Sequence, residues 1–282
     1  MPMNQSLIGK TYTQAESITV STEAALAYAA ATVGVGGQTL TAYVDGSVAP
    51  PMYGVAYSFG ALGAPILDPE LGVEMMRLVH GEQEMRFVKA VRPGDVITSK
   101  SSVFAIEPKT SGELLVVAIT SQNQRGEIVL EAKSALFIRG PRKKEHLEGE
   151  QAEKAREEAE WQALPRLFEE VVVVAADQSK RYAAASGDHN PIHLDDDVAK
   201  MAGLPSIILH GLCTMAFVHD ALVRRFGPDP LCVRRLAVRF NRPVLMGDRL
   251  TIEARGSAQR LAFQMRNQDG VVVLKAGQAE IA

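Results

Sequence analysis

Residues 126–137 read GEIVLEAKSALF, and residues 270–281 read GVVVLKAGQAEI. Both stretches begin with glycine and continue through β-branched and apolar residues, with Val, Leu and Ala at matching places. A glycine turn followed by such a run is typical of a β-strand that closes a hairpin. The likeness of the two stretches indicates that one structural unit occurs twice in the chain.

Two further matches occur in the same order. YAAA at residues 28–31 returns at residues 182–185. A third set matches at an offset of 153: Phe87, Gly94, Asp95 and Thr98 correspond to Phe240, Gly247, Asp248 and Thr251. The chain has 282 residues, enough for two units of about 100–150 residues each. We therefore expect a first unit at residues 1–140 and a second at residues 166–282.

Between the units, residues 140–165 read GPRKKEHLEGEQAEKAREEAEWQALP. The stretch is rich in charge and in helix formers, which predicts a solvated, partly helical linker at residues 141–165. In the second unit we expect one long apolar helix at residues 207–227, stopped by Gly227. Strands are expected at 233–244, 248–258, 261–268 and 270–281. A helix buried against an antiparallel sheet makes each unit α+β.

Composition excludes several classes of function. The net charge is −3 without a large basic block, so nucleic acid is not an expected partner. No run approaches the roughly 18 apolar residues of a membrane span. The only cysteines are Cys213 and Cys232, which favours reduced thiols. Because the opening MPMNQSLIGK also lacks an apolar core, we expect a cytoplasmic protein.

The stretch SGDHNPIH at residues 186–193 gathers an acid, two histidines, an asparagine and a proline. A helix would separate Asp188 and His193 by about 140°, but Pro191 disfavours helix at Asn190, and a tight loop can bring the two side chains together. Asp188 and Asn190 could instead only stabilise a turn, and His193 could be structural. The residues by themselves leave both interpretations open.

Residues 182–193, YAAASGDHNPIH, followed by ILHGLC at 208–213, resemble the hydratase signature of the MaoC-like family. The chain is similar over nearly its whole length to (R)-specific type-2 enoyl-CoA hydratases built from two hotdog repeats. The first copy joins the resemblance through VHGEQ at 79–83 and PGD at 93–95. It implies a double hotdog, two tandem curved antiparallel sheets that each wrap around a long central helix.

The resemblance also implies an enzyme, a hydro-lyase that reversibly hydrates (2E)-enoyl-CoA to (R)-3-hydroxyacyl-CoA. In one scheme Asp188 takes a proton from water and His193 delivers a proton to C2. The Gly211 amide would bind the thioester oxygen, and Asn190 would orient the water or the thioester. Packing for Gly211 and a turn for Asn190 are the alternatives. For His210 we expect packing or a structural hydrogen bond.

The first copy has YAAATVGVGGQTL where the second has YAAASGDHNPIHL, so Asp, Asn and His are missing from it. We expect it to be non-catalytic and to accommodate the acyl chain. By resemblance His80 and Gly81 line the substrate site, Lys109 meets the CoA portion, and Phe240 flanks the pantetheine or acyl path. Lys109 as a solvated charge and Phe240 as a core residue are the alternatives.

The expected ligand is acyl-CoA as substrate, with no cofactor. No His, Cys or Asp cluster has the spacing of metal ligands, so no metal is expected. The fused pair resembles a dimer within one chain, and the sequence leaves a further homodimer open. Two other functions compete: a hotdog thioesterase and a non-catalytic acyl-CoA binding module. Release of free thiol would favour the first, and tight binding without turnover would favour the second.

Overall fold

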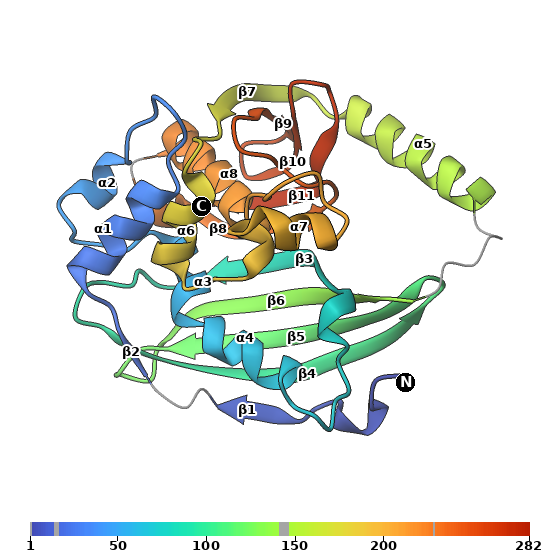
Figure 1. The fold of residues 1–282 in the computed structure, drawn as a ribbon. Helices are drawn as coiled ribbons and strands as arrows, with labels where there is room; N and C mark the ends of the chain where they lie inside the picture. The colour runs from blue at the N-terminus through green and yellow to red at the C-terminus, as the bar shows by residue number, and fades with distance from the viewer. Residues whose placement is uncertain (1, 14–16, 141–146, 228) are drawn as a thin grey trace.

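One antiparallel sheet runs through the whole molecule (Figure 1). The computed structural model describes residues 2–13, 17–140, 147–227 and 229–282. The strands are β1 (Thr11–Thr13), β2 (Ile18–Thr19), β3 (Leu78–Phe87), β4 (Val96–Lys109), β5 (Gly112–Gln122), β6 (Ile128–Arg139), β7 (Arg166–Val173), β8 (Val233–Phe240), β9 (Arg249–Gly256), β10 (Arg260–Arg266) and β11 (Val272–Ile281). Their order is β1-β4-β5-β6-β3-β8-β11-β10-β9-β7, with β2 on β4.

The two halves of the sheet meet where β3 pairs with β8. Glu82 lies opposite Arg239, and Glu84 lies opposite Ala237. Arg239 Nε donates to Glu82 at 2.7 Å. Arg235 donates to both carboxylate oxygens of Glu84, at 3.0 and 2.9 Å. Backbone pairing and charge-assisted bonds therefore join the halves into one sheet.

The described residues also form helices. In chain order they are α1 (Thr22–Ala31), α2 (Thr41–Val44), α3 (Gly54–Tyr57), α4 (Phe59–Ile66), α5 (Leu147–Ala163), α6 (Gln178–Ser186), α7 (Asp196–Met201) and α8 (Gly211–Phe226). Figure 1 shows α3 and α4 over β4, β5 and β6, and α8 beside β8–β11. In α8 every residue from Cys213 to Val223 is buried, so this helix forms the core of the second half.

The helix expected at residues 207–227 begins four residues later, at Gly211. Ile208 forms an isolated β-bridge with Leu245, and Leu209 N–H donates to the Val244 carbonyl at 2.8 Å. These bonds hold residues 208 and 209 in extended backbone, which an apolar composition cannot distinguish from a first helical turn. The end at Phe226, with Gly227 as cap, agrees with the prediction.

The first half builds its central segment from shorter pieces. A 3₁₀ turn (Pro51–Tyr53) leads into α3 and α4, with Pro65 inside α4. Both central segments begin with a glycine whose carbonyl accepts from a nearby hydroxyl at 2.6 Å: Ser58 Oγ, four residues after Gly54, and Thr214 Oγ1, three residues after Gly211. The first copy thus retains the start of the α8-like segment, and its proline limits the length.

The repeat is visible in individual hydrogen bonds. Gln124 Nε2 donates to Asp95 Oδ1 at 3.1 Å, and Gln268 Nε2 donates to Asp248 Oδ1 at 3.0 Å. These residues stand at the offsets read from the sequence. Tyr28 and Tyr182, equivalent in the two copies, meet with their hydroxyl oxygens 3.4 Å apart. The internal repeat predicted from the sequence is confirmed by this pattern.

The linker is mostly exposed, but its end is attached to the second half through Trp161. Residues 141–146 lie outside the described residues, and α5 follows them. Trp161, near the end of α5, is only 5% exposed. The Arg255 guanidinium lies 5.1 Å from the Trp161 ring centroid and donates to the Gln162 and Leu164 carbonyls, each at 3.2 Å. The helix and the exposure of most of residues 155–165 agree with the prediction of a solvated, partly helical linker, and Trp161 with its Arg255 contacts is the buried exception.

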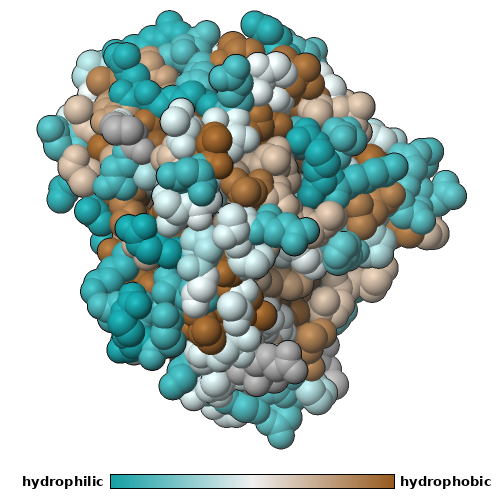
Figure 2. All heavy atoms as spheres, turned by 90° about the vertical axis from the view of Figure 1, so that its left-hand side faces the viewer, coloured by the Kyte–Doolittle hydropathy of each residue, from teal (hydrophilic) through white to brown (hydrophobic). Residues whose placement is uncertain are grey.

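The outer surface is mixed in character. On the side that carries α1 and α2, hydrophobic residues are scattered among hydrophilic ones (Figure 2). Such scattering is normal for a face in contact with water. Within the described part of the chain, no helix is both long and apolar enough to span a bilayer.

Candidate active site

A sharp turn after α6 sets the position of Asp188. Gly187 caps the helix with φ of 78°, a left-handed conformation that glycine adopts without steric cost. The Asp188 N–H donates to Ser186 Oγ at 3.2 Å, and Asp188 Oδ1 accepts from the Asn190 N–H at 3.1 Å. The half-exposed carboxylate therefore stands at the start of a hydrogen-bonded loop, and its other oxygen takes no part in that turn bond.

His193 lies in the 3₁₀ turn Pro191–His193, which Asn190 caps by accepting from the Ile192 N–H. The loop geometry expected at this point is confirmed, and the exposed Asn190 makes the turn bond considered for it. The His193 ring is 8% exposed, and Nδ1 lies 2.8 Å from the Ile208 carbonyl oxygen. A carbonyl only accepts, so Nδ1 carries the proton and the neutral ring leaves Nε2 as an acceptor.

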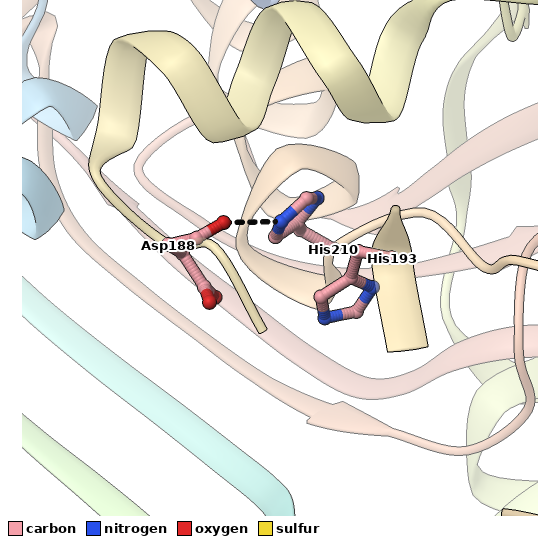
Figure 3. Close-up of side chains that lie close together, drawn as sticks. All are labelled: Asp188, His193 and His210. Carbon is pink, nitrogen blue, oxygen red and sulfur yellow. Dashed lines mark hydrogen bonds between the residues drawn. The ribbon is translucent and has the colours of Figure 1, made fainter. Parts of the chain in front are cut away.

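A second imidazole completes the cluster. His210 Nε2 donates to the Asp188 carbonyl at 3.0 Å, and its ring stacks on His193 with centroids 3.8 Å apart and planes at 27°. One ligand-type atom from each of Asp188, His193 and His210 falls within 4.8 Å of the others. Figure 3 shows the Asp188 carboxylate and one ring nitrogen of His193 facing the same space. The packing and hydrogen bond expected for His210 are confirmed.

Burial favours the neutral form of both rings. It lowers the pKa of His193, while the hydrogen bond to Ile208 and the negative charge of Asp188 act in the opposite direction. Burial and, to a smaller extent, the neighbouring His193 together lower the pKa of His210 to about 4, although the charge of Asp188 opposes the shift. At neutral pH the cluster therefore contains two uncharged imidazoles beside a carboxyl group.

Gly211 is the first residue of α8 and lies against Phe240. A Cβ at Gly211 would stand 2.9 Å from Cδ1 and Cε1 of Phe240, so glycine is required unless the ring moves. The N–H groups in the first turn of a helix have no intrahelical acceptor, and the helix dipole adds positive potential there. The partly buried Phe240 packs on the core, which is the alternative considered for it, and also lies against Gly211; its place beside the pantetheine or acyl path stays a prediction.

His80 and Gly81 lie on β3 close to this region. The His80 ring meets Phe240 edge-on at 5.1 Å, and His80 Nε2 lies 3.1 Å from Gln83 Oε1. Burial lowers the pKa of His80, and the charge of Asp188 opposes this shift. Gly81 lies at a bulge, between His80 and Glu82, where β3 shifts register against β6. The histidine and the bulge thus stand near the cluster.

Lys109 is placed differently. It ends β4 at the tip of a hairpin, 46% exposed, with Nζ 2.6 Å from Glu107 Oε2. This is the solvated charge considered as its alternative, and a contact with CoA stays a prediction.

A pocket opens between the first-half helices and the sheet. It contains about 300 Å³ of empty space, including its open mouth. It is lined by Val55, Ser58, Phe59, Leu62, Gln83, Met85, Ile119, Ala132, Ser134 and Leu212. Leu212 is the neighbour of Gly211, so the pocket adjoins the start of α8. Sequence analysis did not identify these residues individually, because only the pairing of distant strands and helices brings them together.

In the described part of the chain, Asp188, His193 and His210 form the one group able to act as three metal ligands. His193 Nδ1 and His210 Nε2 already face carbonyl oxygens. The other ring nitrogens, His193 Nε2 and His210 Nδ1, keep their lone pairs, and histidines that ligate a metal commonly have their second nitrogen bonded in this way, so these hydrogen bonds do not exclude a metal. The absence of a metal stays a prediction.

Comparisons with known proteins match each half of the chain to a family of domains. Residues 160–277 match the family described as MaoC like domain, and residues 6–132 match the FAS1-like, dehydratase domain region. A Dictyostelium discoideum protein named Probable enoyl-CoA hydratase 2 is 28% identical over 84% of this chain and 82% of its own.

Two solved structures share the fold. One, named MaoC-like dehydratase, has a TM-score of 0.80 at 18% identity and covers 98% of both chains. The second, from Mycobacterium tuberculosis, is described as having a double hotdog fold. It has a TM-score of 0.64 at 15% identity and covers 97% of this chain and 95% of its own. The α+β double hotdog predicted from the sequence is confirmed.

Proposed function

Because the chain belongs to the MaoC-like dehydratase family, we propose that it is a hydro-lyase that reversibly converts (2E)-enoyl-CoA into (R)-3-hydroxyacyl-CoA. The observation that supports this most strongly is the convergence of the Asp188 carboxylate and the His193 imidazole in the loop that precedes the first turn of α8. A carboxylate and a neutral imidazole can each accept one hydrogen of the same water molecule. The pair would hold that water beside the C2–C3 double bond.

The hydrogen bond of His193 suggests how the proton moves. With Nδ1–H on the Ile208 carbonyl, Nε2 accepts a proton from water as the water oxygen bonds to C3. The resulting imidazolium then donates the Nε2 proton to C2, so one proton leaves water and one reaches carbon. The Asp188 carboxylate accepts the second hydrogen of the water and stabilises the imidazolium. In this proposal His193 is the base. The scheme considered from the sequence had instead assigned the base to Asp188.

Gly211 supplies the second requirement of the reaction. Attack at C3 places negative charge on the thioester oxygen, and a preorganised N–H stabilises that charge in the transition state. The Gly211 amide at the start of α8 is free of an intrahelical acceptor, and no Cβ blocks the approach. Asn190 and Lys109 have weaker support: Asn190 caps a turn, and Lys109 pairs with Glu107.

The first half takes the acyl chain in this proposal. Its pocket adjoins Gly211 through Leu212, and most of the lining side chains are apolar. His80, Gly81 and Phe240 would flank the passage from the reacting carbons to the pocket. The proposal keeps three segments: a non-catalytic unit at 1–140, a linker at 141–165 and a catalytic unit at 166–282. Absence of a cofactor, a cytoplasmic location and a dimer of two chains are further parts of the proposal.

Hydration is tested with crotonyl-CoA and longer (2E)-enoyl-CoAs. Loss of the enoyl thioester absorbance should accompany formation of the (R)-3-hydroxyacyl product, identified by chiral chromatography. A saturated acyl-CoA in the same assay distinguishes the thioesterase, because only that activity releases free CoA thiol. Binding of enoyl-CoA without turnover would identify a binding module instead. Either outcome would refute the proposed reaction.

A further inference from the structure

We propose that His210 is a positioning residue, which holds the Asp188 loop and the His193 ring in the arrangement needed to bind one water. This inference rests on the proposed hydration. His210 is 1% exposed and is the cap residue immediately before α8. It is therefore placed to act through its neighbours rather than by touching the substrate.

The first contact anchors the loop. Within the loop, the Asp188 N–H donates to Ser186 Oγ and the Asp188 carboxylate accepts from the Asn190 N–H. Both partners belong to the same short segment as Asp188. His210 Nε2 instead ties the Asp188 carbonyl to the start of α8, 22 residues further along the chain. The chain before His210 is itself fixed, because the Leu209 N–H donates to the Val244 carbonyl. The position of the Asp188 carboxylate is therefore fixed relative to the buried helix α8.

The second contact orients the base. Stacking of the His210 ring on the His193 ring, 3.8 Å away, limits rotation of His193 about its side-chain bonds. The titratable groups facing His210 are Asp188 and His189 on the loop, His193 on the 3₁₀ turn and Tyr182 on α6. Because His210 stays uncharged, the negative charge of Asp188 acts on His193 without a competing cation in the stack.

The inactive copy provides an internal comparison. Tyr53 precedes Gly54 there, as His210 precedes Gly211, and it packs on Tyr28 at 5.5 Å as His210 packs on Tyr182 at 4.9 Å. An aromatic ring therefore satisfies the packing at this position. The aligned stretches put Gly34 where Asp188 stands. His210, whose ring forms a hydrogen bond to the loop, therefore occurs in the copy that has Asp188, and Tyr53 occurs in the copy that has Gly34 instead.

The experiment compares His210→Phe, which keeps a ring and loses the donor, with His210→Gln, which keeps a side-chain N–H. Tyr53→Phe is the matched control. For His210→Phe we expect kcat for crotonyl-CoA to fall about 10- to 100-fold with KM nearly unchanged, because misplacement of about 1 Å costs this much. His210→Gln should recover part of the loss, and Tyr53→Phe should stay close to wild type.

A pH profile separates positioning from packing. If Asp188 is held less firmly, it raises the pKa of His193 less, and the acid limb of kcat/KM should move to lower pH in His210→Phe. Wild-type kcat and an unmoved limb would overturn the inference, as would a rise in KM alone. If His210→Phe does not fold, His210→Asn, which is too short to reach the carbonyl, replaces it. Absence of hydration in the wild-type enzyme would instead reject the proposed function itself.

Discussion

Replacing Asp188 by asparagine removes the charge and leaves the loop bonds in place. The side-chain oxygen can still accept from the Asn190 N–H, and the main-chain carbonyl still accepts from His210. The substitution therefore tests the carboxylate with little effect on the fold. We expect the free energy of unfolding to change by no more than about 0.5 kcal/mol, as for an ordinary surface position.

The catalytic effect should be far larger. Asp188 orients the water and stabilises the imidazolium that forms on His193, and loss of such a carboxylate can cost up to about 10⁴-fold, so the barrier should rise by about 3–5 kcal/mol. Asp188 and His193 hold the same water, so their losses should not multiply. Asp188→Asn combined with His193→Gln should be about as slow as the slower single variant. Enoyl thioester absorbance measures turnover, and thermal melting checks the fold.

An independent measurement concerns the charge itself. In the resting enzyme the charge of Asp188 raises the pKa of His193 against the effect of burial. NMR titration of the His193 ring should therefore give a lower pKa in Asp188→Asn than in the wild type. The reasoning would be refuted by turnover within about tenfold of wild type in Asp188→Asn. Losses that multiply in the double variant would refute it equally.

Three further predictions concern the surroundings of the site and the fold. Gly211→Ala should reduce hydration by about tenfold or more, since its Cβ displaces the Phe240 ring, and adding Phe240→Ala should recover part of the turnover in the same assay. Burial lowers the pKa of His219 to about 3 in the folded protein, whereas an unfolded chain keeps a value of about 6.5. Between these two pH values the unfolded state binds a proton at His219 that the folded state does not. The free energy of unfolding therefore decreases as pH falls from about 6.5 toward 3. His219→Leu should therefore show a smaller fall in Tm between neutral and acidic pH, and an unchanged fall would exclude His219 as a cause. Arg235→Met should destabilise the chain by about 1–2 kcal/mol in urea unfolding, because it leaves Glu84 without its two-bond partner, whereas no change would show the pair to be neutral.

The fold was largely predictable because its signal is repeated. Glycine turns, strand runs and the Asp95 and Asp248 turns recur at nearly fixed offsets, and each forms the same local hydrogen bonds in the structure. The start of α8 was not predictable. Ile208 and Leu209 are as apolar as the helix that follows, and only their pairing with Leu245 and Val244, in the loop between β8 and β9, makes them extended.

The site was predictable in part. Asp188, His193 and Gly211 belong to one compact motif, so sequence alone identified them as candidates. The stacking of His210 on His193 depends on two segments 17 residues apart, and no spacing rule specifies it. Contact between Phe240 and Gly211, and the pocket beside Leu212, likewise arise from tertiary packing. The motif therefore identifies the reactive side chains, whereas the contacts and the pocket around them depend on how the whole sheet packs.

The junction of β3 and β8 has a consequence for assembly. Each strand presents a different charge pattern to its neighbour, glutamates at 82 and 84 on one side and arginines at 235 and 239 on the other. If β8 aligned with a second β8 in the corresponding register, Arg235 would oppose Arg239 twice over. If β3 aligned with another β3 in that register, Glu84 would oppose itself, but Glu82 would oppose Arg86 twice, which is attractive. A seam of two β8 strands would therefore meet electrostatic repulsion, whereas β8 is matched to β3 through Glu82 and Glu84.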